Sequence, residues 1–229
     1  MPVAPPISED ELMSRARAVS GQRLGDLGAA HGVSVPPDLR RAKGWVGNLM
    51  ERLLGATATS RSVPDFEKIG VELKTLPVSS RGVPLESTFV CTIPLGEVGD
   101  VEWEESRVFR KIRRVLWMPV QGERQIPVGE RMVGAPLLWS PSDAQCAQLR
   151  FDWEELAGVI GRGDVESITG HLGVVLQVRP KAANAASRRR GVDQDGANFA
   201  TLPRGFYLRS SFTRGILADN FSLPEVRRP

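Results

Sequence analysis

Two carboxylates and a lysine lie close together in the segment from Asp65 to Lys74. Residues Val71 to Leu76 have the composition of a β-strand, in which successive side chains point to opposite faces. Glu72 and Lys74 therefore share one face of this strand, whereas Leu73 points to the other face, where a core can bury it. Asp65 lies a short turn upstream, so the spacing predicts two carboxylates with an ammonium group beside them.

These three residue types suit one kind of chemistry. Two carboxylates can hold one or two Mg²⁺ ions, because this cation prefers oxygen ligands and keeps some of its waters. A lysine beside them can orient or deprotonate an attacking water, or stabilise negative charge that develops on a phosphate. Together they are the groups needed for metal-assisted hydrolysis of a phosphodiester. The alternative interpretation of the same spacing is a surface strand that carries an ion pair.

A helix predicted from about Lys43 to Leu54 presents a further acidic residue, Glu51. The apolar positions of this helix recur with helical spacing and form a core face: Val46, Leu49, Met50, Leu53 and Leu54. Glu51 lies on another face with Gly44, Gly47 and Gly55, and each glycine costs a helix about 1 kcal/mol relative to alanine. That bare face allows two interpretations, namely close packing against another element or access for a metal ion and a DNA backbone to Glu51.

Basic residues gather in two segments. The segment from Arg107 to Arg114 holds five basic residues in eight positions. The segment from Arg179 to Gly191 is rich in Ala, Asn and Ser, follows no period and includes the run Arg188-Arg189-Arg190. Such segments either contact phosphates or are merely solvated. We expect the second segment to be mobile in the absence of DNA.

Tyr207 is the only tyrosine of the chain. Alternation along the strand predicted from Leu202 to Leu208 places Phe206 and Leu208 on one face and Tyr207 on the other. If Phe206 and Leu208 point to the core, Tyr207 points outward. From the alternation alone, Tyr207 is either an ordinary strand residue with a solvated hydroxyl or a residue that faces a ligand.

Length, charge and cysteine content exclude several classes of protein. The 229 residues are enough for one large domain or for two lobes that share a core. The formal net charge is only +3, so any DNA-binding face must come from local clustering of the 30 Lys and Arg residues. Cys91 and Cys146 are the only cysteines, which excludes the usual zinc-site spacings and a disulfide scaffold. No apolar run approaches the ~18 residues of a membrane span and no signal peptide is evident, so we expect a cytoplasmic protein without a membrane partner.

Periodicity and turn residues predict a mixed α/β fold in a single domain, 1–229, with residues 1–7 and 222–229 frayed. Helices are expected over about 8–21, 24–30, 43–54, 142–160 and 213–219. Strands are expected over about 71–76, 89–93, 101–103, 174–178 and 202–208. Ser8 and Ser140 are the predicted N-caps of the first and fourth helices. The first two strands, which a Ser-Ser-Arg-Gly turn separates, are expected to form an antiparallel pair at the heart of the sheet.

The sequence as a whole resembles a known family. Pro64-Asp65 followed by Glu72-Leu73-Lys74 resembles the PD-(D/E)xK motif of restriction-type nucleases. Further segments occur in the same order as in the MutH family of DNA mismatch-repair endonucleases: Lys43-Gly44-Trp45-Val46-Gly47, Glu51 with Leu54-Gly55-Ala56, Gly70-Val71-Glu72-Leu73-Lys74-Thr75, Thr88-Phe89-Val90-Cys91, Arg114-Val115-Leu116-Trp117, Gly134-Ala135-Pro136-Leu137-Leu138-Trp139-Ser140-Pro141, Trp153-Glu154-Glu155-Leu156, Arg179-Pro180-Lys181-Ala182-Ala183-Asn184 and Thr201-Leu202-Pro203-Arg204-Gly205-Phe206-Tyr207-Leu208. The resemblance extends from about Glu9 to Phe221.

The resemblance implies an α/β restriction-endonuclease-like fold, a mixed β-sheet flanked by helices, with two lobes around a DNA-binding cleft. It also implies a Mg²⁺-dependent endonuclease that nicks the unmethylated strand of double-stranded DNA at hemimethylated d(GATC) sites in methyl-directed mismatch repair. Activation by MutL, itself recruited by mismatch-bound MutS, belongs to the same expectation. One catalytic motif in 229 residues favours a monomer. Two alternatives remain, a stand-alone d(GATC) restriction endonuclease and a catalytically inert reader of DNA methylation.

The resemblance further assigns roles to the catalytic residues. Asp65 and Glu72 hold the metal, Lys74 positions or activates the water, and Glu51 completes the electrostatics of the site.

Several residues are expected to contact DNA. Lys43 and Lys111 match basic positions of the family near the site and near the DNA, respectively. Arg179 and Lys181 match positions that approach base edges. Tyr207 matches the position that senses adenine methylation. The run Arg188, Arg189 and Arg190 is expected to meet phosphates.

Overall fold

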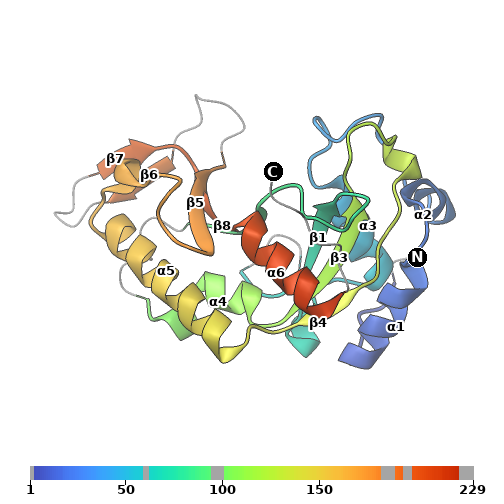
Figure 1. Cartoon of the computed structure of the whole chain (residues 1–229), viewed down its shortest axis with the longest axis horizontal. Coiled ribbons are helices and arrows are strands. Elements are labelled where there is room, and N and C mark those ends of the chain that lie inside the picture. The colour runs from blue at the N-terminus through green and yellow to red at the C-terminus, as the bar shows by residue number, and fades with distance from the viewer. Residues whose placement is uncertain (1–2, 59–61, 94–100, 182–188, 193–197, 222–229) are drawn as a thin grey trace. The chain divides into compact units, whose positions relative to one another are not determined.

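The computed structural model describes residues 3–58, 62–93, 101–181, 189–192 and 198–221, and for 189–192 and 198–201 it describes the backbone only. The chain divides into two compact units (Figure 1). Unit 1 comprises residues 1–86, 114–140 and 214–229, and unit 2 comprises residues 87–113 and 141–213. Within the part of the chain that the structure describes, no helix is long and apolar enough to cross a membrane.

Unit 1 is built on a three-stranded mixed sheet. Its strands are β1 (Glu72–Val78), β3 (Val115–Gln121) and β4 (Leu137–Trp139), in the order β1-β3-β4. Strand β1 runs parallel to β3, with Glu72 opposite Val115, whereas β4 runs antiparallel to β3. The mixed α/β class is therefore confirmed. The predicted antiparallel pairing of β1 with the next strand is wrong, because the chain passes from unit 1 to unit 2 between these strands and the partner of β1 comes much later.

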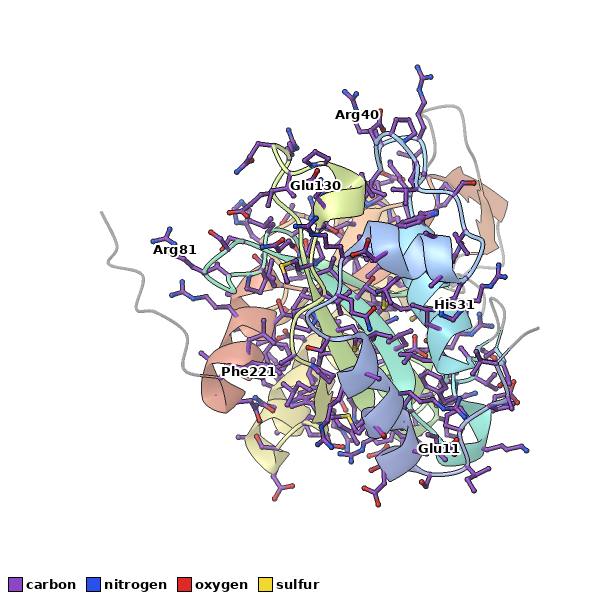
Figure 2. All side chains as sticks on the ribbon, turned by 90° about the vertical axis from the view of Figure 1, so that its right-hand side faces the viewer. Glu11, His31, Arg40, Arg81, Glu130 and Phe221 are labelled. Atoms are coloured by element: carbon purple, nitrogen blue, oxygen red, sulfur yellow. The ribbon has the colours of Figure 1, made fainter. Side chains whose placement is uncertain are left out.

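Three helices cover one face of this sheet, as Figure 2 shows from their side. They are α1 (Glu9–Val19), α2 (Leu24–Ala30) and α3 (Trp45–Leu54). Their apolar stripes bury the sheet residues Leu73, Leu116 and Met118 in one common core. Each fully buried Leu or Met stabilises the fold by about 1.5–3 kcal/mol relative to an exposed side chain, so this core fixes β1 against α3.

The ends of the helices follow the sequence only in part. The hydroxyl of Ser8 accepts a hydrogen bond from Glu11 N at 3.2 Å, which confirms this N-cap. The carboxylate of Glu11 accepts from Ile7 N at 2.8 Å instead of from Ser8, so the capping box is incomplete. The N-cap of α5 (Asp143–Gly161) is Ser142 and not Ser140, because Ser142 forms a full capping box with Gln145.

The glycines of α3 do not form the bare face that periodicity predicts. Gly44 and Gly55 cap the two ends of the helix with φ of +89° and +82°, a left-handed conformation that glycine adopts at little cost. Only Gly47 lies inside α3, and a Cβ there would lie 3.9 Å from Thr75 Oγ1, an ordinary contact. The left-handed backbone therefore explains Gly44. Close packing also favours Gly55, where a Cβ would lie 2.5 Å from the carbonyl oxygen of Ala4, but it does not explain Gly47.

Unit 2 is built on a three-stranded antiparallel sheet. Its strands are β2 (Thr88–Thr92), β8 (Arg204–Leu208) and β5 (Leu176–Pro180), in the order β2-β8-β5. Strand β2 carries an irregularity between Phe89 and Cys91. The strand predicted at 101–103 is wrong, since Trp103–Glu105 form a short 3₁₀ turn whose Trp103 is buried against Phe109 and Trp153.

Two further helices and two further strands lie outside these sheets and the helical layer of unit 1. Helix α4 (Arg107–Ile112) belongs to unit 2, and α6 (Ser210–Asn220) begins in unit 2 and ends in unit 1. Strands β6 (Arg189–Val192) and β7 (Asn198–Thr201) pair antiparallel. The prediction of an aperiodic segment from Arg179 to Gly191 is therefore wrong for 189–191, which lie in β6, and for Arg179 and Pro180, which end β5. Residues 182–188 of this segment lie outside the described residues, as do 1–2, 193–197 and 222–229, so its mobility stays a prediction.

A buried carboxylate fixes the start of β5 to α5. Asp152 is fully buried, and its Oδ2 accepts hydrogen bonds from Val175 N at 2.6 Å and Leu176 N at 2.8 Å. Gln148 Nε2 donates to the other oxygen at 2.9 Å. Charge-assisted hydrogen bonds of this kind offset the cost of burying a carboxylate. Since Leu176 begins β5, Asp152 sets where this strand starts.

Candidate functional site

The residues between Asp65 and Lys74 form one hydrogen-bonded group. Asp65 Oδ2 accepts from Leu73 N at 2.9 Å, and Glu72 Oε2 accepts from Asp65 N at 3.3 Å. Lys74 Nζ donates to Glu72 Oε1 at 2.7 Å. The short turn between Phe66 and Val71, closed by hydrogen bonds in both directions, brings Asp65 back onto the strand. The structure thus brings together the three residues that the spacing singled out.

The two carboxylates are withdrawn from water. Asp65 is 9% exposed and Glu72 is 2% exposed, whereas the side chain of Lys74 keeps 14% of its surface accessible. The ion pair between Glu72 and Lys74 therefore does not lie on a solvated surface strand, which was the alternative interpretation of the spacing. The charges of two buried carboxylates are poorly screened by water, so a further cation beside them is favourable. Their oxygen atoms suit a hard divalent ion, which typically binds one or two carboxylates and completes its shell with water and phosphate.

Glu51 precedes this hydrogen-bonded group in the sequence. It belongs to α3, the helix that packs on β1. It is half-buried in α3, off the apolar stripe that buries Leu49, Met50, Leu53 and Leu54. Among the residues that the structure describes, no three acidic, histidine or cysteine side chains converge as ligands of one metal ion. A role for Glu51 as a third metal ligand therefore finds no support, and its expected electrostatic role stays a prediction.

The basic run from Arg107 to Arg114 does not form one solvated face. Lys111 is buried in unit 2, with 8% of its surface exposed. Arg110 donates to the carbonyl of Glu105. The guanidinium of Arg114 donates to both carboxylate oxygens of Glu9. The backbone carbonyl of Arg114 accepts a hydrogen bond from Glu72 N at 3.0 Å. The run therefore serves the fold of both units as well as any ligand.

The remaining basic positions lie elsewhere. Lys43 is exposed in the turn that precedes α3, in the loop where Figure 2 shows Arg40 projecting into solvent. Arg189 and Arg190 lie in β6, opposite Thr201 and Ala200. Arg188 lies outside the described residues.

Five residues of unit 2 form an aromatic–basic cluster: Ser87, Phe89, Arg179, Lys181 and Tyr207. The rings of Phe89 and Tyr207 meet edge to face with their centroids 5.3 Å apart. Lys181 Nζ lies 3.2 Å from the centroid of the Phe89 ring, and Arg179 Cζ lies 6.0 Å from that of Tyr207. Cation–π and edge-to-face contacts of this kind each contribute roughly 0.5–1.5 kcal/mol.

The strand register explains why these residues meet. Phe89 lies opposite Tyr207 across β2 and β8, and Arg179 lies opposite Gly205 across β5 and β8. The position of Gly205 has no room for a side chain, because a Cβ there would lie 2.7 Å from a ring carbon of Phe89. As the alternation predicted, Phe206 and Leu208 are buried and Tyr207 is half-buried on the opposite face.

Sequence reasoning missed Ser87 and Phe89 as members of this cluster. Alternation along β2 shows that the two side chains share a face. Nothing local shows that this face adjoins Arg179, because the pairing passes through β8, which comes far later in the chain.

Comparison with known proteins agrees with the geometry. Residues 54–152 match the family model described as "DNA mismatch repair enzyme MutH". The chain is 52% identical over 223 residues to the DNA mismatch repair protein MutH of Yersinia enterocolitica, which covers 97% of this chain and 98% of that protein. It is 53% identical over 221 residues to the MutH proteins of Salmonella paratyphi B and Salmonella typhimurium, with 96% of each chain covered.

A mixed sheet flanked by helices, whose strand β1 carries Glu72 and Lys74 and is preceded by the turn that holds Asp65, defines a restriction-endonuclease-like protein. The chain belongs to the MutH family of DNA mismatch-repair endonucleases. It is accordingly a DNA-binding hydrolase that acts in a repair pathway, and a nuclease family of this kind suggests a divalent metal cofactor.

Proposed function

We propose that this chain is a Mg²⁺-dependent endonuclease that nicks the unmethylated strand of hemimethylated d(GATC) duplexes. It acts as a cytoplasmic monomer in methyl-directed mismatch repair, and MutL activates it after mismatch-bound MutS has recruited MutL. The observation that supports this function best is the buried group in which Lys74 Nζ lies 2.7 Å from Glu72 Oε1 while Asp65 is bonded to the Leu73 amide. Such a group is far more specific than the spacing of the same residues in sequence.

Asp65 and Glu72 are the residues that would hold Mg²⁺. When bound, the ion supplies Lewis-acid polarisation of the phosphate and lowers the pKa of water. The two side chains would hold the ion in a fixed position, because each is itself held by a backbone amide, Asp65 by Leu73 N and Glu72 by Asp65 N. Fixed ligands need little reorganisation during the reaction, which is how a site of this kind lowers the barrier.

Lys74 acts on the attacking water and on the developing phosphate charge. Its ammonium group is held by Glu72, so it points along the same face of β1 as that carboxylate. In the proposed reaction it orients the water for in-line attack and donates to a non-bridging oxygen in the transition state. Glu51, half-buried on the helix against β1, adds negative charge that favours the bound cation.

Unit 2 supplies recognition in this proposal. Arg179 and Lys181 are exposed on β5 and just beyond it, and would approach base edges in the major groove. The arginines 188–190 contact the phosphate backbone. Lys43 of unit 1 adds positive charge near the carboxylate–lysine group, and Lys111, which is buried, adds positive charge near the DNA.

Tyr207 is proposed to read methylation. An N6-methyl group on adenine lies in the major groove, adds bulk and removes one amino hydrogen. The ring of Tyr207 has restricted freedom because Phe89 lies against it and Arg179 lies over it. A ring held in this way leaves room for the unmodified amino group of adenine on the strand to be cut, and it collides with a methyl group at the same position.

One experiment separates this function from its rivals. Supercoiled plasmid with a hemimethylated d(GATC) site is incubated with Mg²⁺, with and without MutL and ATP. Nicked circles that increase with MutL support the proposal. Linear product in the absence of MutL indicates the stand-alone restriction endonuclease, and binding without any product indicates the inert reader.

A further inference from the structure

One hydrogen bond of the aromatic–basic cluster joins strands that are far apart in the sequence. Arg179 Nη1 donates to Ser87 Oγ at 2.5 Å, and the two residues are 92 positions apart. Ser87 precedes β2, and Arg179 lies in β5, on the other side of β8. The hydrogen bond therefore spans the sheet from one edge strand to the other.

This contact fixes the direction of an exposed arginine. The guanidinium is held at two places, by Ser87 at Nη1 and by the nearby Tyr207 ring, 6.0 Å from its Cζ. Pro180, which follows directly, restricts the backbone at the end of β5. A free arginine side chain loses much rotamer entropy when a ligand orders it, and an arginine that is already ordered avoids this loss.

We propose that Ser87 is a positioning residue for sequence recognition, which holds Arg179 oriented before DNA binds. The inference rests on the proposed function, because it assumes that Arg179 reads base edges. Among the described residues Ser87 engages Nη1 only, which leaves the edge formed by Nη2 and Nε for a ligand, and a paired donor edge is what bidentate recognition of a guanine requires. Ser87 thus selects which edge of the arginine faces the DNA, although it need not touch DNA itself.

The neighbouring residue offers a matched control. Thr88 also carries a hydroxyl on β2 but points to the opposite face, where its Oγ1 is buried without a hydrogen-bond partner among the described residues. Thr88→Val therefore removes a hydroxyl one position away without touching the cluster. Because the Ser87 hydrogen bond is exposed, its loss should leave the melting temperature unchanged.

The test measures kcat/KM on oligonucleotide duplexes that contain either one hemimethylated d(GATC) or a single-base variant of it. Ser87→Ala should lower the ratio of the two values about threefold to tenfold, mainly through a higher KM on d(GATC). Ser87→Thr, which keeps the hydroxyl, and Thr88→Val should retain the parent ratio. The salt dependence of binding should not change in any of them, because no charge is removed.

A double-mutant cycle makes the test specific. In an Arg179→Ala background, Ser87→Ala should have no further effect on the ratio, since its partner is gone. Two results would overturn the role of Ser87 if the parent enzyme discriminates between the duplexes. One is an unchanged kcat/KM ratio in Ser87→Ala. The other is a Ser87→Ala loss in this ratio that is as large in the Arg179→Ala background as in the parent. A parent enzyme that cuts both duplexes equally well would overturn the proposed function, and this inference with it.

Discussion

The carboxylate–lysine group of unit 1 and the aromatic–basic cluster of unit 2 are held in place by different means. Asp65, Glu72 and Lys74 are joined by hydrogen bonds between residues two to eight positions apart, and the carboxylates are buried. Arg179 and Lys181 are exposed and are oriented by Ser87 and Phe89 from a strand far away in the sequence.

This difference separates the energetics of the two sites. Removing one partner of a buried ion pair strongly destabilises the folded protein, because the other charge stays buried without compensation. A substitution in the carboxylate–lysine group of unit 1 should therefore affect both chemistry and folding. An exposed contact contributes little to stability, so a change in unit 2 can alter recognition and leave the fold intact. The carboxylate–lysine group, which is proposed to be catalytic, is thus protected by burial, whereas the more exposed aromatic–basic cluster, which is proposed to recognise DNA, can change without loss of the fold.

The largest effect is expected from Lys74→Ala. Nicking should fall roughly 10²–10⁴-fold, because the lysine acts on the transition state, while DNA affinity changes little. Without metal, the protein should also lose stability, since Glu72 is left buried without its ammonium partner. Single-turnover nicking, a binding titration and thermal unfolding measure the three quantities.

Lys68→Ala is the matched control, because Lys68 is an exposed lysine of the same unit. It should leave nicking at the parent rate. An equal loss of binding and rate in Lys74→Ala would identify Lys74 as a phosphate anchor and not as part of the catalytic group.

Tyr207→Ser should weaken the discrimination against methylated DNA without a comparable loss of chemistry. Fully methylated d(GATC) duplexes should be nicked at a rate nearer the hemimethylated one, a gain of roughly tenfold, as expected when a base contact of ~1–3 kcal/mol is removed. The comparison of nicking rates on the two duplexes measures it. Tyr207→Phe keeps the ring against Phe89 and separates its bulk from its hydroxyl. If Tyr207→Ser rejects methylated DNA as strongly as the parent, methylation is read by other residues.

Mg²⁺ should stabilise the folded protein through unit 1. Binding to two buried carboxylates raises the free energy of unfolding by about 1.4 kcal/mol when the free ion is ten times its Kd. Thermal unfolding with increasing Mg²⁺, and after chelation, measures the shift. Glu72→Gln should abolish the shift, whereas Glu86→Gln, at an exposed glutamate of the same unit, should keep it. A shift that persists in Glu72→Gln would place the ion elsewhere.

The smallest effect concerns the ion pair between Glu9 of α1 and Arg114, which directly precedes β3. Hydrogen bonds from Arg114 lower the pKa of Glu9 below its usual value of 4.5. The stabilisation is therefore present above about pH 4.5 and is lost as the pH falls through the lowered pKa. Both side chains are about one third exposed, 32% for Arg114 and 39% for Glu9, so the pair contributes under about 1 kcal/mol after solvent screening.

Glu9→Gln should accordingly flatten the acid limb of the stability curve, measured by denaturant unfolding between pH 3 and pH 6, roughly the range over which such carboxylates titrate. Asp10→Asn removes a carboxylate from the same helical turn and serves as the control. If the two variants show the same acid limb, the Glu9–Arg114 pair does not stabilise the fold.

The sequence by itself determined what depends on neighbours along the chain. Alternation placed Glu72 and Lys74 on one face and predicted that Leu73, Phe206 and Leu208 would be buried. Helical spacing identified the buried stripe of α3, and the short return from Asp65 to Glu72 kept the catalytic group within one turn and one strand. These features follow from the two periods of the backbone, which are local properties.

Only the tertiary structure decided which distant segments meet. The parallel pairing of β1 with β3, the capture of Arg114 by Glu9 across 105 positions and the hydrogen bond from Arg179 to Ser87 across 92 positions all depend on strand order and register. The sequence also placed Arg114 in a single basic run with Lys111, whereas one lies in unit 1 and the other is buried in unit 2. Long-range contacts form where the packing of the whole unit offsets the entropy of closing a long loop, and no local period encodes that balance.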